Sequence, residues 1–287
     1  MHILKHSLIH SLEDNIGLIP FLFLTYFIME YLEQVMEKKA EAAVRYSGKM
    51  GPLWGGLLGL IPQCGFSAAA ASFFSGGVIT LGTLLAIFWS TSDEMLPILI
   101  SATVPFGTIV KILATKVTIA VLAGFAVDLV LKKFGKTAPK HIHDLCEQAH
   151  CHCEEKHAMW KSALLHTVKV WGFLFLVSLL LNLALELGGE AVLERFAMNN
   201  SVLAVVLTGL VGLVPNCASS VIITQLYVNE LISAGAMMAG LLVGAGVGVL
   251  VLFRTNRPIL QNVKILGLLY AVGIAAGCII DLCGVTF

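Results

Sequence analysis

Charged residues are scarce in this sequence. They make up 13% of its 287 residues, and hydrophobic residues make up 57%, whereas a soluble domain is about a quarter charged. No Lys, Arg, Asp or Glu occurs between Lys49 and Asp93, or between Arg195 and Glu230. Because a membrane-spanning helix needs about 20 mainly apolar residues, each charge-free stretch can hold more than one membrane-embedded segment. The composition excludes an ordinary soluble domain and predicts an all-α polytopic membrane protein.

Other absences narrow the function. The net charge is zero and basic residues gather on no periodic face, so nucleic acid is not an expected partner. The sequence has no nucleotide-binding loop, no HExxH and no nucleophile elbow, which favours a protein that is not an enzyme. We expect no permanently bound cofactor. The N-terminus also lacks the pattern of a cleaved signal peptide, so the apolar run from about Ile16 is expected to stay as a span.

An internal repeat is present. GLLGLIPQCGFS, from Gly56 to Ser67, recurs as GLVGLVPNCASS, from Gly209 to Ser220, so that Pro215 follows Pro62 by 153 positions. The same offset pairs further glycines, prolines and charged residues: Gly82 with Gly235, Pro105 with Pro258, Lys111 with Lys264, and Asp128 with Asp281. Agreement at polar and special residues indicates a duplication.

Each copy is predicted to hold one span, one Pro-interrupted segment and two further spans. The expected segments are 15–36, 52–76, 79–101 and 107–131 in the first copy, and 166–187, 201–226, 232–254 and 264–284 in the second. The chain therefore divides into a first transmembrane repeat (1–131), a polar linker (132–165) and a second transmembrane repeat (166–287).

Loop charges favour one topology. If each Pro-interrupted segment is a re-entrant hairpin, the basic residues of three loops fall inside: Lys38, Lys39, Arg45 and Lys49, the basic linker, and Arg254 and Arg257. Glu190 and Glu194 then fall outside, in agreement with the positive-inside rule. Three crossings per copy give two inverted-topology repeats, typical of secondary transporters, with about ten helical segments. We expect a bacterial or archaeal cytoplasmic membrane, with the N-terminus outside and the linker inside.

The two Pro-centred motifs are the first candidate site. Proline breaks a helix, and in a membrane the freed backbone groups need partners from protein, water or substrate. Polar residues accompany both prolines, and we expect them to bind the substrate: Gln63, Cys64, Ser67, Asn216, Cys217 and Ser220. The plainer interpretation is a kink packed by small residues.

The second candidate is the polar run from Ser90 to Glu94. A carboxylate within the membrane is costly, and Asp93 and Glu94 face different sides of a helix. We expect one to face the transport pathway and the other to meet a neighbour such as Lys111 or Lys116. The second copy has Gly246 and Val247 at the paired positions, so only one copy supplies charge. The alternative is a structural salt bridge.

The third candidate is the linker, which is rich in preferred ligands of transition metals. Eight such residues fall within 17 positions: His141, His143, Cys146, His150, Cys151, His152, Cys153 and His157. No fixed zinc-finger spacing appears. The segment is interpreted as a regulatory or capture loop for metal, or as a solvated linker that binds metal incidentally.

The doubled GL[LV]GL[IV]P[QN]C motif, the TSDEMLP segment and the His-rich linker together resemble the ten-transmembrane heavy-metal exporter family. Its members are labelled arsenic efflux permeases or manganese transporters. The resemblance covers nearly the whole chain and implies efflux of a metal or metalloid. Oxygen ligands with a soft thiol suit a divalent transition metal, and we expect Asp93, Glu94, Cys64, Cys217 and Asn216 to bind it. Manganese is the first choice because the family suggests it.

The sequence leaves alternatives open. A permease for arsenite, an organoarsenical or a small organic anion would use the positive field of half-helix N-termini and depend little on Asp93. A membrane thiol-redox protein would use Cys64 and Cys217. The expected partners are the metal ion and the lipid bilayer, and a homodimer is left open.

Overall fold

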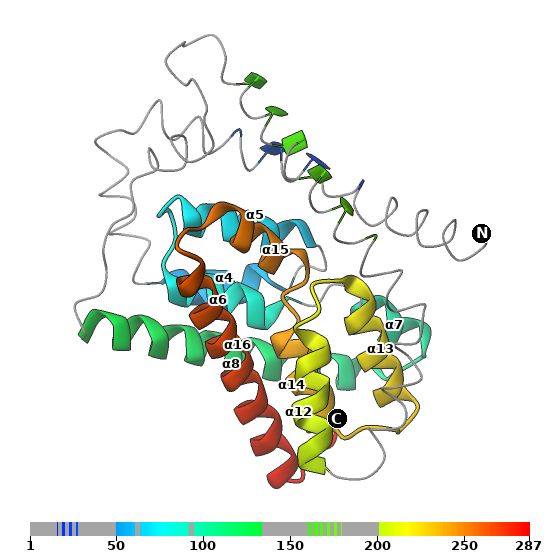
Figure 1. Cartoon of the computed structure of the whole chain (residues 1–287). Helices are drawn as coiled ribbons and strands as arrows, with labels where there is room; N and C mark the ends of the chain where they lie inside the picture. Colours follow the sequence, from blue (N-terminus) through cyan, green and yellow to red (C-terminus); the bar gives the residue numbers. More distant parts are fainter. Residues whose placement is uncertain are drawn as a thin grey trace.

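The computed structural model describes residues 50–60, 64–91, 95–133 and 201–287, with scattered helical positions between 16 and 27 and between 160 and 179. Within these residues the chain is helical and has no strand, as predicted. The helices of the first half are α4 (Gly51–Leu58), α5 (Cys64–Ser75), α6 (Leu81–Ser90), α7 (Met95–Ser101) and α8 (Phe106–Lys133) (Figure 1). Those of the second half are α12 (Ser201–Gly212), α13 (Cys217–Val228), α14 (Ala234–Val243), α15 (Val247–Thr255) and α16 (Ile259–Leu282).

Four helical stretches in the described part of the chain are long and apolar enough to cross a membrane: Leu81–Ser101, Phe106–Lys133, Ala234–Thr255 and Ile259–Leu282. The first and third are mostly buried inside the protein, whereas α8 and α16 leave most of their surface exposed. Leu122 and Leu129 on α8 are about two-thirds exposed. Continuous exposed apolar faces of this size suit contact with lipid, and α8 and α16 each present one.

The helix is interrupted at both Pro-centred motifs. α4 ends at Leu58 and α5 begins at Cys64, and in the second half α12 ends at Gly212 and α13 begins at Cys217. Proline lacks a backbone N–H and clashes with the preceding turn, which explains both breaks. The predicted first spans of the two copies, 15–36 and 166–187, lie largely outside the described residues.

Two further breaks differ from the sequence prediction, which had continuous spans over 79–101 and 232–254. α6 stops at Ser90 and α14 stops at Val243. At the first break, the hydroxyls of Ser90 and Thr91 both donate to the Ile87 carbonyl, at 3.1 and 2.7 Å; such local bonds compete with continued helix. At the second, Gly246 has φ +53°, which glycine adopts without strain.

Helix bounds recur with the sequence offset. Both ends of α5, α6 and α13, α14 correspond at 153 positions, and so do their caps. Thr80 accepts a hydrogen bond from the Thr83 N–H at 3.1 Å, and Ser233 accepts one from Ala236 at the same distance. In each half, the first helix (α4 or α12) packs with α6 and α8 or with α14 and α16. The duplicated residues thus form duplicated local structure.

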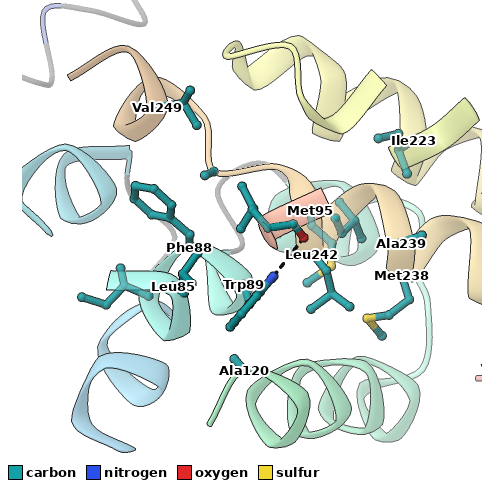
Figure 2. Packing of buried hydrophobic residues seen from close by; sticks show 14 of the residues in the cluster. Leu85, Phe88, Trp89, Met95, Ala120, Ile223, Met238, Ala239, Leu242 and Val249 are labelled. Atoms are coloured by element: carbon teal, nitrogen blue, oxygen red, sulfur yellow. Dashed lines mark hydrogen bonds between the residues drawn. The ribbon is translucent and has the colours of Figure 1, made fainter. Parts of the chain in front are cut away.

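Helices also pack between the halves. α5 lies beside α15, and α7 lies beside α13 (Figure 1). The core continues across this boundary: buried Trp89 of α6 donates from Nε1 to the Leu269 carbonyl of α16 at 3.2 Å (Figure 2). The half-helices that follow the breaks therefore contact the opposite half of the chain as well as their own.

Candidate functional site

The two breaks of the first half lie against each other. A Cβ on Gly59, which follows α4, would contact the Ser90 hydroxyl and lie 2.8 Å from the Ile87 carbonyl. A Cβ on the equivalent Gly212 would lie still closer, 2.2 Å, to the Gly240 carbonyl of α14. Since neither approach leaves room for a side chain, glycine is required at both positions. The residue that follows α4 and the last residue of α12 therefore pack closely against α6 and α14, respectively.

The two halves meet at the starts of α5 and α15. A Cβ on Gly248 would lie 2.8 Å from both Cβ and the carbonyl oxygen of Ser67 and 2.9 Å from the Phe88 ring. Further along, the hydroxyls of Ser75 and Thr255 lie 2.8 Å apart. These contacts show that α5 and α15 run parallel, with their N-terminal ends together. The segment before each of these ends is a helix break.

The structure describes some of the predicted site residues. Ser67 and Ser90 are fully buried, and Asn216 is almost so. The Asn216 carbonyl accepts the hydroxyl of Ser219 at 2.7 Å, in the first turn of α13. Ser220 is half-buried, and its carbonyl accepts the hydroxyl of Thr224 at 2.7 Å. Among the described polar positions of the two motifs, Ser67 and Asn216 thus lie inside the protein.

Other predicted residues fall elsewhere. Cys64 and Cys217 begin α5 and α13, but their side chains are outside the described part. Gln63, Asp93 and Glu94 also lie outside the described residues. So does the whole loop that was predicted to bind metal: His141, His143, Cys146, His150, Cys151, His152, Cys153 and His157. Among the described residues, no group of three or more His, Cys, Asp or Glu side chains could hold a metal ion.

The side chain of Lys116 reaches the helix break that follows Ser90. Its side chain, on α8, is fully buried, and its ammonium donates to the carbonyl of Thr91, the last described residue before the acidic pair. Lys111, the other lysine considered as a neighbour of the acidic pair, is exposed. Thr91 and Met95, which flank the undescribed positions 92–94, are both buried. Buried residues thus flank positions 92–94 on both sides, and one of them, Thr91, accepts a hydrogen bond from the Lys116 ammonium.

The second half has uncharged residues at the positions equivalent to Lys116 and the acidic pair. Thr91 corresponds to Gly244, and Lys116 corresponds to Leu269, whose carbonyl binds Trp89. Leu269 is fully buried. Sequence reasoning found the asymmetry between Asp93–Glu94 and Gly246–Val247 but not its extension to Lys116. The signal was available, because a lysine within an apolar span is rare without a partner.

Asp128 and Asp281, which the repeat pairs, have a structural role. Asp128 accepts the Thr80 hydroxyl at 2.7 Å and the Gly82 N–H at 2.8 Å. Asp281 does the same with Ser233 and Gly235, at 2.7 and 2.8 Å. Each carboxylate caps the N-terminus of a neighbouring helix.

Comparison with known proteins identifies one relationship. The family model described as "putative, 10TM heavy-metal exporter" matches residues 4–193. That range includes the first Pro-centred motif, the acidic segment and the His/Cys-rich linker. No curated protein and no solved structure matches the chain.

Proposed function

Because this chain belongs to the ten-transmembrane heavy-metal exporter family, we propose that it is a secondary-active transporter that exports a divalent transition metal ion, with manganese as the first candidate. The matched family consists of membrane transporters, and transport is a non-enzymatic function. The ion, the coupling and the site are the parts we propose here.

The observation that carries the site is the junction of helix breaks within the protein. Gly59 lies against Ser90, Gly248 lies against Ser67, and the residues at these contacts are buried. Broken helices inside a membrane protein present free backbone groups, which are tolerated where they line a cavity or bind substrate. We therefore place the ion at this junction, next to the polar run that follows Ser90, and propose that the second Pro-centred break faces it.

The donor set supports a transition metal. We propose that Asp93 and Glu94 supply carboxylates and Asn216 an amide oxygen, with thiols from Cys64 and Cys217; Gln63, Ser67, Ser90 and Ser220 complete the polar lining. Mixed oxygen and sulfur ligands favour manganese, iron, cobalt or zinc over magnesium and calcium. Protonation of one carboxylate would couple metal export to the proton gradient.

The charges of the helix turns support the inverted arrangement. The exposed turn between α15 and α16 carries Arg254 and Arg257, and the equivalent turn of the first half carries Ser101 and Val104. Under the positive-inside rule the arginine turn is cytoplasmic, and an inverted repeat puts its neutral equivalent on the opposite side. The His/Cys-rich linker is then cytoplasmic, where it would capture metal or regulate its export.

Transport in proteoliposomes tests the function. Purified protein would be assayed with manganese, iron, cobalt, zinc and magnesium, with and without a pH gradient. We expect wild type to transport manganese, and Asp93→Asn to lose about tenfold or more of the flux, since even an indirect change at a metal site costs 10–100-fold. Glu230→Gln, which removes an exposed carboxylate far from the breaks in sequence, is the matched control. Metal fluxes no higher than those of protein-free liposomes would rule out a metal exporter, and equal fluxes in wild type and Asp93→Asn would rule out the role of Asp93.

One observation favours a second candidate, a permease for an arsenical or a small organic anion. The N-terminal ends of α5 and α15 lie together, and the Lys116 ammonium is buried at the neighbouring break. Helix N-termini and a cation together favour negative or electron-rich ligands. Arsenite transport that persists in Asp93→Asn and is lost in Cys64→Ser/Cys217→Ser would support this candidate.

A further inference from the structure

The turn that joins α15 to α16 borders an open cavity of about 740 Å³, a volume within the range of ligand-binding pockets. Two cationic side chains line this cavity, those of Arg254 and Arg257, and both are exposed. The other lining residues are apolar: Phe253, Pro258 and Ile259. The cavity therefore combines a positive rim with an apolar wall.

The turn lies at the surface of the membrane. It joins two stretches that are long and apolar enough to cross a bilayer, Ala234–Thr255 and Ile259–Leu282, so it is placed at the level of the lipid headgroups. In the first turns of α16, Ile259 and Leu260 are each 64% exposed and Val263 is 50% exposed. These side chains continue the apolar wall of the cavity toward the lipid interior. A ligand with a charged head and an apolar tail suits such a surface.

A buried pair of amides holds the turn in place. Asn256 lies between the two arginines in sequence, and its side chain donates to the side chain of Asn262 on α16. The Asn262 amide donates in turn to the carbonyls of Asn256 and Leu252, at 2.9 and 3.3 Å. Both asparagines are buried. Because the turn is already ordered, a ligand that binds there loses little free energy to ordering the backbone.

The helices around the turn carry little negative charge. α15 packs mainly on α5 and α16, and within these three helices the one carboxylate is Asp281, at the opposite end of α16. Lys264 of α16 is exposed and adds a third cation on the side of the turn. An arginine carries several N–H donors in a planar fork, so a contact within the protein still leaves donors for a phosphate oxygen. The charge of this surface is complementary to an anion.

The repeat shows that the turn forms without these residues. The equivalent turn of the first half joins α7 to α8. There the arginines correspond to Ser101 and Val104, and the two asparagines correspond to Thr103 and Ile109. The proline that precedes α16 is kept, as Pro105. Since the arginines and their amide anchor are not needed to build the turn, their presence in one half favours a role in binding.

We propose that the turn between α15 and α16 binds the phosphate of an anionic phospholipid, whose acyl chains lie along the exposed face of α16. Arg254 and Arg257 donate to the phosphate oxygens, which the planar guanidinium can bind in a bidentate manner. The apolar wall favours a lipid over a free phosphate ion, because a free ion gains nothing from Phe253 or Ile259. Basic pockets between transmembrane helices suit anionic headgroups in this way. Gly248 lies at the other end of α15, so the lipid site is distinct from the proposed ion site.

Lipid binding to the purified full-length protein, measured by native mass spectrometry, tests the proposal. Wild type should bind phosphatidylglycerol more tightly than phosphatidylcholine. Arg254→Gln/Arg257→Gln should weaken phosphatidylglycerol binding about twentyfold, since each basic residue near an anionic headgroup contributes about fivefold. Phosphatidylcholine binding should not change. Arg254→Lys/Arg257→Lys should show a smaller loss, because lysine keeps the charge without the planar fork.

The matched control is Lys132→Gln/Lys133→Gln, which removes the same charge from exposed positions at the end of α8 and should leave the affinity near that of wild type. Equal losses in the arginine variant and the control would show general attraction of anionic lipid and overturn a site at this turn. Displacement of phosphatidylglycerol by an equal concentration of inorganic phosphate would show a site for a soluble anion and overturn lipid recognition.

Single variants keep the test decisive if the double variant does not fold. Arg254→Gln and Arg257→Gln should each weaken phosphatidylglycerol binding about fivefold, and no loss in either would overturn the proposal. Lipid binding is measured without transport. The result is therefore independent of which ion, if any, the protein exports.

Discussion

The indole N–H of Trp89 donates a hydrogen bond to the Leu269 carbonyl, 3.2 Å away, and so joins α6 of the first half to α16 of the second. Both residues are fully buried. The bond satisfies the indole N–H, which would otherwise be buried without a hydrogen-bond partner at a cost in folding free energy. It also gives a direct test of how the halves are held together.

Trp89→Phe should destabilise the protein by about 2–4 kcal/mol. The change removes the donor, leaves the Leu269 carbonyl without it, and opens a cavity in the core. Thermal unfolding in detergent measures the effect. The control is Trp54→Phe, because Trp54 of α4 is 62% exposed. Equal melting temperatures for the two variants would contradict the packing of Trp89 between the halves.

Asp128→Ala and Asp281→Ala should each cost about 1–3 kcal/mol, because each removes the acceptor of a hydroxyl and of a helix N-terminal N–H. The two sites are equivalent in the repeat, so their effects should be similar. Asp128→Asn should be milder, since its amide oxygen can still accept the Gly82 N–H. Chemical denaturation measures stability. Changed metal selectivity in the surviving protein would show instead that these carboxylates contact the substrate.

Gly248→Ala should destabilise the contact between α5 and α15. The added methyl would lie 2.8 Å from Ser67 atoms, a clash that costs about 1–3 kcal/mol when the core cannot yield. Transport should fall as well, because the clash occurs next to a break. Gly267→Ala on α16 is the control, since nothing lies within 4 Å of its new methyl. The control should be neutral or slightly stabilising.

Single cysteines at Ser101 and Arg254 should react from opposite sides of the membrane. The positions are equivalent in the repeat, and both are exposed. In a cysteine-free background, a membrane-impermeant maleimide applied to right-side-out vesicles should label Ser101→Cys but not Arg254→Cys. Labelling of both residues from one side would rule out inverted repeats.

Local features of the fold could be predicted from the sequence. Proline removes a helix donor wherever it stands, so the breaks before Cys64 and Cys217 were predicted correctly. The break after Ser90 was missed because its surroundings are apolar enough to be a continuous span. Its signal was the hydroxyl run at Ser90 and Thr91, which bonds back to Ile87.

Partners distant in sequence could not be predicted. The offset pairs Asp128 with Asp281, but nothing local indicates that Asp128 binds Thr80, 48 residues earlier. The packing of α5 on α15 was also hidden. The sequence CGFSAAAASFFS of α5 is small and apolar around much of its surface, so its pattern does not specify one face or one partner helix.

The exchange of half-helices between the two halves has a mechanical consequence. α5 is covalently part of the first half but packs on α15, and α13 is part of the second half but packs on α7. Rocking one half against the other therefore cannot leave either pair undisturbed: the chain pulls each half-helix one way while its packing partner holds it in place. Strain from such a motion would concentrate where α4 and α12 end, so the segments that we propose to bind the substrate would also act as the hinges.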